Sequence, residues 1–166
     1  HGMLGQGQES GRDQGHATLC IALMGAFCQM AYNIGEDLFG YQDNKVLAMA
    51  EYTAKYNLWN DFSNRTSTAD EYFKYRKKGF PYTYYENCSW QCPELSSKEE
   101  NDKSRGEIRP CWALIYNHYK SEKGLEAYYT KQFMDGMGVE GGGGHYGTTS
   151  GGFDQAGFGT LMYTRE

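Results

Sequence analysis

The feature that most constrains this chain is an uncharged stretch near its start. Over residues 16–32 (HATLCIALMGAFCQMAY) almost every residue is apolar or small, and none is Asp, Glu, Lys or Arg. A helix that is apolar all round is normally buried on all sides. Small residues such as Gly25 and Ala26 would let neighbouring helices approach closely. We therefore expect an inner helix that other helices surround.

Helices of two kinds alternate along the rest of the chain. Residues 41–56 place apolar side chains at helical spacing among charged ones, which predicts an amphipathic outer helix. Residues 108–119 read as a second inner helix with Pro110 in its first turn, residues 124–137 as a second outer helix, and residues 151–163 as a third inner helix. This order predicts an all-α fold in which helical hairpins form a ring. A four-helix bundle is the alternative, and it would show a similar apolar stripe on every helix.

Residues 57–104 interrupt this alternation. The segment holds turn residues, aromatic residues and charged runs without a stable period, so we expect a long loop excursion within one domain. Its basic run, residues 74–78, is more typical of a solvated loop than of a binding patch. The net charge of −5 also disfavours nucleic acid as a partner.

Other classes of protein are excluded by what the sequence does not contain. No run of 18 apolar residues predicts a membrane span. The glycines at 141–144 lack the lysine of a phosphate-binding loop and follow no predicted strand, which argues against nucleotide binding. Because the chain starts at His1 without a leader, we expect its beginning to have been lost or processed away.

The five cysteines divide by their spacing. Cys20 and Cys28 lie eight residues apart in a predicted helix, about 12 Å along its axis, which is too far for a disulfide. Cys88 and Cys92 flank a short polar turn where a local disulfide is easy to form. A metal site would need a second pair of ligands at suitable spacing. We prefer the disulfide, and free thiols and a metal site remain open.

Two glycosylation sequons lie in the same segment. They begin at Asn64 (NRT) and Asn87 (NCS), where a surface loop is expected. Because chance predicts about one sequon in a sequence of this composition, they support a secreted protein only modestly.

The start of each predicted inner helix carries polar residues that its apolar body does not require. If the three helices run parallel, these starts meet at one mouth, where free N–H groups favour a carboxylate. At the first start, Arg12 and His16 lie four residues apart and would share a helix face. Arg can hold a carboxylate and His can take a proton. The alternative is a helix cap and ion pair with Asp13.

The other two starts supply further candidates. Arg105 and Arg109 suit an anion, although ion pairing with Glu107 is equally natural. His145 and Tyr146 follow the glycine run, which could bring backbone close to a ligand or serve only as a turn.

Four segments of the sequence resemble the C-terminal part of the alginate-lyase-like polysaccharide lyases, which fold as an α/α toroid of helical hairpins. They cover most of the chain outside the middle loop. The segments are ESGRDQGHATL (9–19), GEDLFGYQDNKVLAMAEYTAKYN (35–57), RGEIRPCWALIYNHY (105–119) and GGGGHYGTTSGGFDQAGFGTLMYT (141–164).

The resemblance implies β-elimination in a uronic-acid polymer such as alginate or glucuronan. In this chemistry the enzyme neutralises the substrate carboxylate, a His or Tyr removes the C5 proton, and a Tyr protonates the leaving oxygen. It needs no metal or organic cofactor. Arg12 and His16 stand where such lyases place catalytic groups, but Leu19 occupies a position where some relatives have Tyr. Tyr146 is therefore the first candidate for the Tyr and Tyr41 the second.

The resemblance also implies that Gln14, Arg109, His145 and Tyr41 contact the acidic polysaccharide. A complete toroid needs more hairpins than this chain supplies, so residues 1–166 are expected to be the C-terminal part of a longer enzyme whose N-terminal remainder completes it. Two other functions remain open. One is a non-catalytic module that binds acidic glycans, and the other is a toroidal glycoside hydrolase using Asp13 and Asp154.

Overall fold

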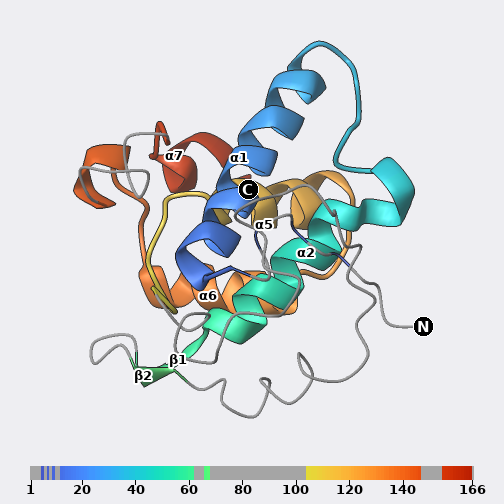
Figure 1. The fold of residues 1–166 in the computed structure, drawn as a ribbon. Coiled ribbons are helices and arrows are strands. Elements are labelled where there is room, and N and C mark those ends of the chain that lie inside the picture. The colour runs from blue at the N-terminus through green and yellow to red at the C-terminus, as the bar shows by residue number, and fades with distance from the viewer. Residues whose placement is uncertain are drawn as a thin grey trace.

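The computed structural model of the chain is mainly helical, which confirms the predicted all-α class (Figure 1). The structure describes Gly5, Gly7, Glu9 and residues 12–61, 66–67, 104–146 and 155–165, with backbone alone for residues 59–61, 66–67 and 145. Its α-helices are α1 (Gln14–Asn33), α2 (Tyr41–Asn57), α5 (Trp112–Asn117), α6 (Tyr128–Met137) and α7 (Gly159–Tyr163).

Shorter elements join these helices. A π-helix, His118–Glu122, continues directly from α5, and a 3₁₀ turn spans Gly143–Tyr146. Two short antiparallel strands, β1 (Trp59–Asp61) and β2 (Thr66–Ser67), lie within the predicted long loop. The rest of that loop lies outside the described residues.

The helices form two antiparallel hairpins. In the first, the amide nitrogen of Asn57 donates to the side-chain oxygen of Gln14 at 2.8 Å, so the end of α2 meets the start of α1. In the second, the rings of Trp112 and Phe133 lie 4.7 Å apart, so α6 returns beside the start of α5. The alternation of helices in the sequence therefore corresponds to successive hairpins.

The two hairpins pack with α1 parallel to α5. Arg109, just before α5, contacts Gly15 and Thr18 at the start of α1. Farther along, Gly25 faces Ile115, and at the far end Tyr32 meets the ring of His118. Since residue numbers rise together along both helices, the first two predicted inner helices run in the same direction.

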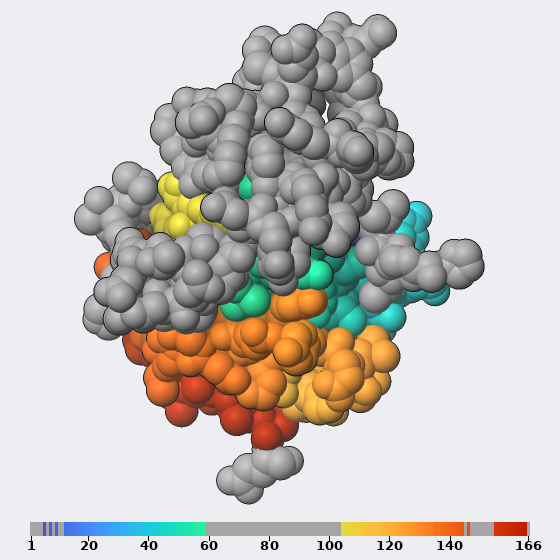
Figure 2. Space-filling view, turned by 90° about the horizontal axis from the view of Figure 1, so that it is seen from below, coloured from blue at the N-terminus to red at the C-terminus, as the bar shows by residue number. Residues whose placement is uncertain are grey.

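The core lies around α5. Trp112, Ile115 and Tyr119 are fully buried, and Phe133 of α6 and Phe39 of the α1–α2 connection pack against the same cluster. In Figure 2, the orange surface that includes α6 lies in the lower part of the face that is seen from below. An inner α5 and an outer α6 agree with the alternation predicted from the sequence.

The expectation that the first helix is buried on all sides is wrong for this structure. One side of α1 faces α2 and α5, but Leu23, Phe27 and Met30 on the other side are 49%, 55% and 62% exposed. Ile34, one turn later, is 81% exposed. Within the described residues nothing covers this stripe, so α1 is apolar all round but packed on one side.

Three helices start later than expected. The outer helix predicted from residue 124 begins at Tyr128. The inner helix predicted from residue 108 begins at Trp112, because Pro110 disfavours the helical conformation of Arg109. The last helix begins at Gly159 rather than at residue 151, although residues 151–154 lie outside the described part.

Glu51 of α2 holds the start of α6, and this contact gives a test of how the hairpins pack. Its two carboxylate oxygens accept hydrogen bonds from the backbone N–H groups of Tyr129 (3.1 Å) and Thr130 (2.8 Å). We expect Glu51→Ala to lower the free energy of unfolding by about 1–2 kcal/mol in urea denaturation, because these donors lose their partner. Glu51→Gln, which keeps one acceptor, should lose less than half as much. Equal losses in both variants would contradict this role.

Candidate active site at the start of α1

Asp13 organises the start of α1. It is the N-cap residue, and its Oδ1 accepts a hydrogen bond from the backbone N–H of His16 at 2.9 Å. The same carboxylate contacts the His16 ring, with Nδ1 at 2.9 Å from Oδ1 and 2.7 Å from Oδ2. One side chain thus begins the helix and fixes the orientation of the imidazole.

The Asp13 contact determines which nitrogen of His16 is available. A carboxylate can only accept at Nδ1, so Nδ1 carries the hydrogen and Nε2 of the neutral ring carries the lone pair. Within the described part of the chain, Asp13 is the side chain that forms hydrogen bonds and an ion pair with the His16 ring, and 35% of the His16 side chain is exposed. A base held at one nitrogen by a carboxylate and open at the other is the arrangement required for proton abstraction.

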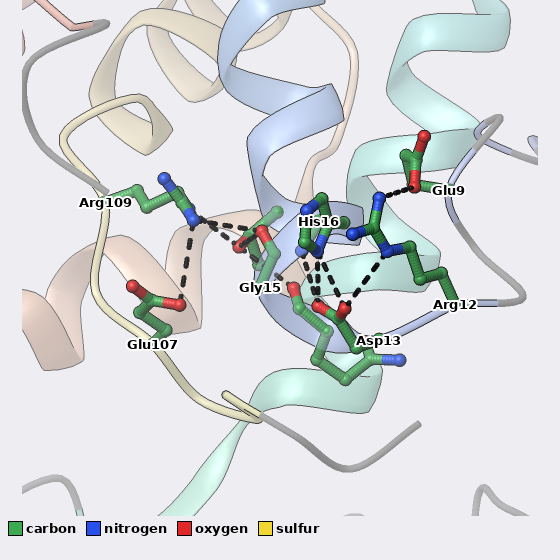
Figure 3. Close-up of polar contacts among 9 residues, drawn as sticks. Glu9, Arg12, Asp13, Gly15, His16, Glu107 and Arg109 are labelled. Atoms are coloured by element: carbon green, nitrogen blue, oxygen red, sulfur yellow. Dashed lines mark hydrogen bonds and ion pairs between the residues drawn. The ribbon is translucent and has the colours of Figure 1, made fainter. Parts of the chain in front are cut away.

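Arg12 lies on one side of this pair (Figure 3). Its Nη1 is 3.5 Å from Glu9 Oε2 and its Nε is 3.7 Å from Asp13 Oδ2. The Arg12 side chain is 48% exposed, and ion pairs this long and open to water contribute little to stability. These two ion pairs therefore hold the guanidinium only weakly.

Arg109 lies on the other side of the helix start, but it has a structural role. Its guanidinium is buried and donates from Nε to Thr18 Oγ1 (3.0 Å) and from Nη2 to the Gly15 carbonyl (3.1 Å). Glu107 Oε2 lies 3.6 Å from Nη2, so the ion pair that the sequence offered as the alternative is present. At 3% exposure, Arg109 holds α1 against α5 and has no room to bind a polymer.

Gln14 also has a structural role. It is buried, and its side-chain oxygen accepts from Asn57 Nδ2. The Asn57 oxygen accepts in turn from the backbone N–H of Gly106 at 2.8 Å. This network connects the start of α1, the end of α2 and the segment before α5. It thereby fixes the helix start that carries Asp13 and His16.

The start of α7 joins the same end of the molecule through Glu140. This carboxylate is 2% exposed, and its Oε1 accepts from the backbone N–H of Ala113 at 2.9 Å. A Cβ at Gly159 would overlap Glu140 Oε2, so the α7 start lies directly against it. Burial raises the pKa of Glu140, while the N–H groups of Ala113, Trp112 and Gly159 oppose the rise. Glu140 therefore joins the start of α7 to the start of α5.

Tyr146 lies beside the segment that contains Glu140. Its hydroxyl accepts a hydrogen bond from the backbone N–H of Gly141 at 3.0 Å, next to Glu140. Burial raises the pKa of Tyr146, and the nearby Glu140 adds to the rise, so the phenol keeps its proton at neutral pH. His145 lies in the same 3₁₀ turn, and its side chain lies outside the described part.

The glycine run beside Tyr146 has a structural function. Gly143 N donates to the Ala156 carbonyl (3.2 Å), and Phe158 N donates to the Gly141 carbonyl (2.9 Å). Gly157 has φ of +76°, and a Cβ there would overlap the backbone of Gly141. Of the two interpretations left open by the sequence, the backbone bridge is the one that these contacts support.

Tyr41 lies at the opposite end of the first hairpin. Because Asn57 at the end of α2 contacts the start of α1, the start of α2 is about 20 Å away at 1.5 Å per residue. Tyr41 is 64% exposed there, and Gln42 donates to its hydroxyl at 3.5 Å. Tyr41 is therefore not part of this site.

Several predicted residues lie outside the described part of the chain. They are Asn64, Asn87, Cys88, Cys92 and Asp154. The glycosylation sites, the local disulfide and the second carboxylate of a hydrolase therefore remain predictions. Cys20 and Cys28 are free thiols, as is Cys111, which confirms that the first two do not pair with each other.

From the sequence, Asp13 was expected only as a cap, an ion-pair partner or a hydrolase carboxylate. In the structure it also orients the His16 imidazole. The spacing was the available signal, since an Asp three residues before His at the start of an apolar run places both at one helix N-terminus. Glu9, the partner of Arg12, was also missed because the segment before α1 has no regular period.

Searches for related proteins do not assign the chain to a family. No protein-family model, curated protein or solved structure matches the chain. Within the described residues, no three His, Cys, Asp or Glu side chains are grouped to hold a metal ion, and no helix is long and apolar enough to cross a membrane.

Proposed function

We propose that the chain is part of a secreted polysaccharide lyase that cleaves a uronic-acid-containing glycan by β-elimination. The observation that carries the proposal is the Asp13–His16 pair, with Nε2 of His16 open beside the half-exposed Arg12. The resemblance of four sequence segments to alginate-lyase-like enzymes supports the same chemistry. The acidic polysaccharide would be the only ligand needed, with no metal or organic cofactor.

Each group at the site has a role in this reaction. Arg12 turns from Glu9 to the uronate carboxylate and neutralises it, which acidifies the C5 proton. Nε2 of His16 takes that proton, and Asp13 stabilises the imidazolium that results. The C5–H and C4–O bonds break and a C4=C5 double bond forms, so the cleaved fragment leaves as an alkoxide that requires a proton.

Tyr146 is the proposed source of that proton. Its raised pKa keeps it protonated before the reaction, as a general acid requires. Its hydroxyl is held by Gly141, next to Glu140, which bonds to Ala113 at the start of α5. His145 precedes it and remains a proposed substrate contact.

The proposed architecture is an incomplete α/α toroid. Two parallel-packed hairpins and the uncovered stripe of Leu23, Phe27, Met30 and Ile34 support it. Further hairpins, supplied by the N-terminal remainder of the same enzyme, would cover this stripe and complete the glycan cleft. A non-catalytic glycan-binding fragment would have the same fold.

An absorbance assay tests the proposed function. The longer enzyme, with the proposed N-terminal remainder, is incubated with alginate, glucuronan and related uronate polymers, and the ultraviolet absorbance of the unsaturated product is followed. A lyase gives rising absorbance with at least one polymer. Saturated reducing ends would instead indicate a hydrolase, and retained binding without product would indicate a binding module. Either result overturns the proposal.

A further inference from the structure

A second cluster of polar and aromatic groups lies at the far end of α1. There the connection between α1 and α2, residues 34–40, packs against the π-helix His118–Glu122. π-Helices are rare and are often found at functional sites. The cluster is remote from Asp13 and His16, and the proposed lyase chemistry does not use it.

His118 is the centre of this cluster. It is 5% exposed, and its ring stacks on Phe39 at 3.7 Å with an interplanar angle of 22°. Tyr32, at the end of α1, meets the ring edge-on at 4.9 Å. Within the described residues, Nε2 of His118 has no hydrogen-bond partner. A neutral imidazole is accommodated in this aromatic pocket, whereas the charged form has no acceptor at Nε2.

Two neighbours of His118 fasten the same connection. The hydroxyl of Tyr119 donates to the Phe39 carbonyl at 2.8 Å, and Lys123 forms an ion pair with Asp37. Asp37 also accepts from the backbone N–H of Gly40 at 3.0 Å. Residues 118–123 therefore hold residues 37–40 at several points, and His118 is the point that a proton can disrupt.

We propose that His118 is an acid-sensitive latch, whose neutral ring holds the α1–α2 connection against the π-helix and whose protonation releases it. The proposal is independent of the lyase chemistry. Release would free Phe39 while α5 and α6 remain packed on each other.

The charges around His118 set the direction of the effect. Burial and, to a smaller extent, Lys123 lower the pKa of His118 from 6.5 to about 4, and Asp37 and Glu122 oppose the shift. The other titratable groups facing it are Tyr32 of α1 and Tyr119. Because the released ring binds a proton more tightly than the latched ring, the latch is fully closed above pH 6.5 and weakens as the pH falls toward 4.

Amide hydrogen exchange tests the latch. With pKa values of about 4 latched and 6.5 released, linkage predicts that opening of the connection is about 30-fold more frequent at pH 5 than at pH 8. The readout is the exchange of the amides of Glu36, Leu38 and Tyr41, corrected for the intrinsic pH dependence. Amides of α6 serve as the internal reference and should show no such change. This pH window lies above the range in which ordinary carboxylates titrate.

His118→Phe is the matched variant, because it keeps a flat ring on Phe39 and removes the titrating group. We expect its connection to open equally often at pH 5 and pH 8. The same 30-fold change in this variant would overturn the proposal. If the variant does not fold, NMR titration of the wild-type His118 ring decides: titration near pH 4 supports the latch, and titration near pH 6.5 overturns it.

Discussion

His16→Ala is expected to reduce lyase turnover by about 10²–10⁴-fold, the usual contribution of a positioned general base. Folding should change little, because the His16 side chain is partly exposed and its backbone N–H still bonds to Asp13. Turnover is measured from the absorbance of the unsaturated product, and folding by urea denaturation. An active His16→Ala variant would remove His16 from the mechanism.

Asp13→Asn tests the role of the carboxylate that orients His16. Asn caps a helix as well as Asp does, so α1 should remain stable. An amide in place of the carboxylate can donate to Nδ1, which moves the ring hydrogen to Nε2 and removes the base. We therefore expect a loss of turnover like that of His16→Ala with little loss of stability. If both turnover and stability were unchanged, Asp13 would be only a cap.

Glu140→Ala is expected to have the largest effect on folding, a loss of about 2–4 kcal/mol in the free energy of unfolding. Removing the carboxylate leaves the buried N–H of Ala113 without its acceptor and creates a cavity against Gly159. Both effects act at the start of α5, the helix around which the core packs. The measurement is urea denaturation followed by circular dichroism.

Glu140→Gln separates the two contributions. It fills the same volume and keeps one acceptor for Ala113 but loses the charge, and the raised pKa of Glu140 shows that the charge is costly at this buried position. We expect Gln to lose less than half as much stability as Ala. If both variants are as stable as the wild type, Glu140 does not join the starts of α5 and α7.

Periodicity in the sequence was sufficient to predict the hairpins. The uncharged stretch and the amphipathic stretch after it became α1 and α2 within a few residues, because their apolar spacing is helical throughout. The boundary of α5 was less accurate, since Pro110 could be placed in a first turn or before it. The exposed side of α1 could not be predicted, because an apolar sequence does not reveal how many neighbours pack against it.

The site was predicted less completely than the fold. Arg12 and His16 were identified as residues that would share one face of a helix starting by Arg12. The structure begins α1 at Gln14, so Arg12 lies before the helix, and both residues contact Asp13 instead. Arg109 was assigned to substrate, but its burial against Thr18 depends on the contact of two segments that lie far apart in the sequence. Such long-range contacts are not visible in local spacing.

The masses of the products test the central claim most directly. β-Elimination divides a uronate chain without adding water, so the fragment masses sum to the mass of the substrate, and one fragment carries the new double bond. Mass spectrometry of a defined uronate oligosaccharide after incubation with the protein should show this sum, and His16→Gln should leave the substrate intact. Fragments whose summed mass exceeds that of the substrate by one water, or equal cleavage by the His16→Gln variant, would contradict the account.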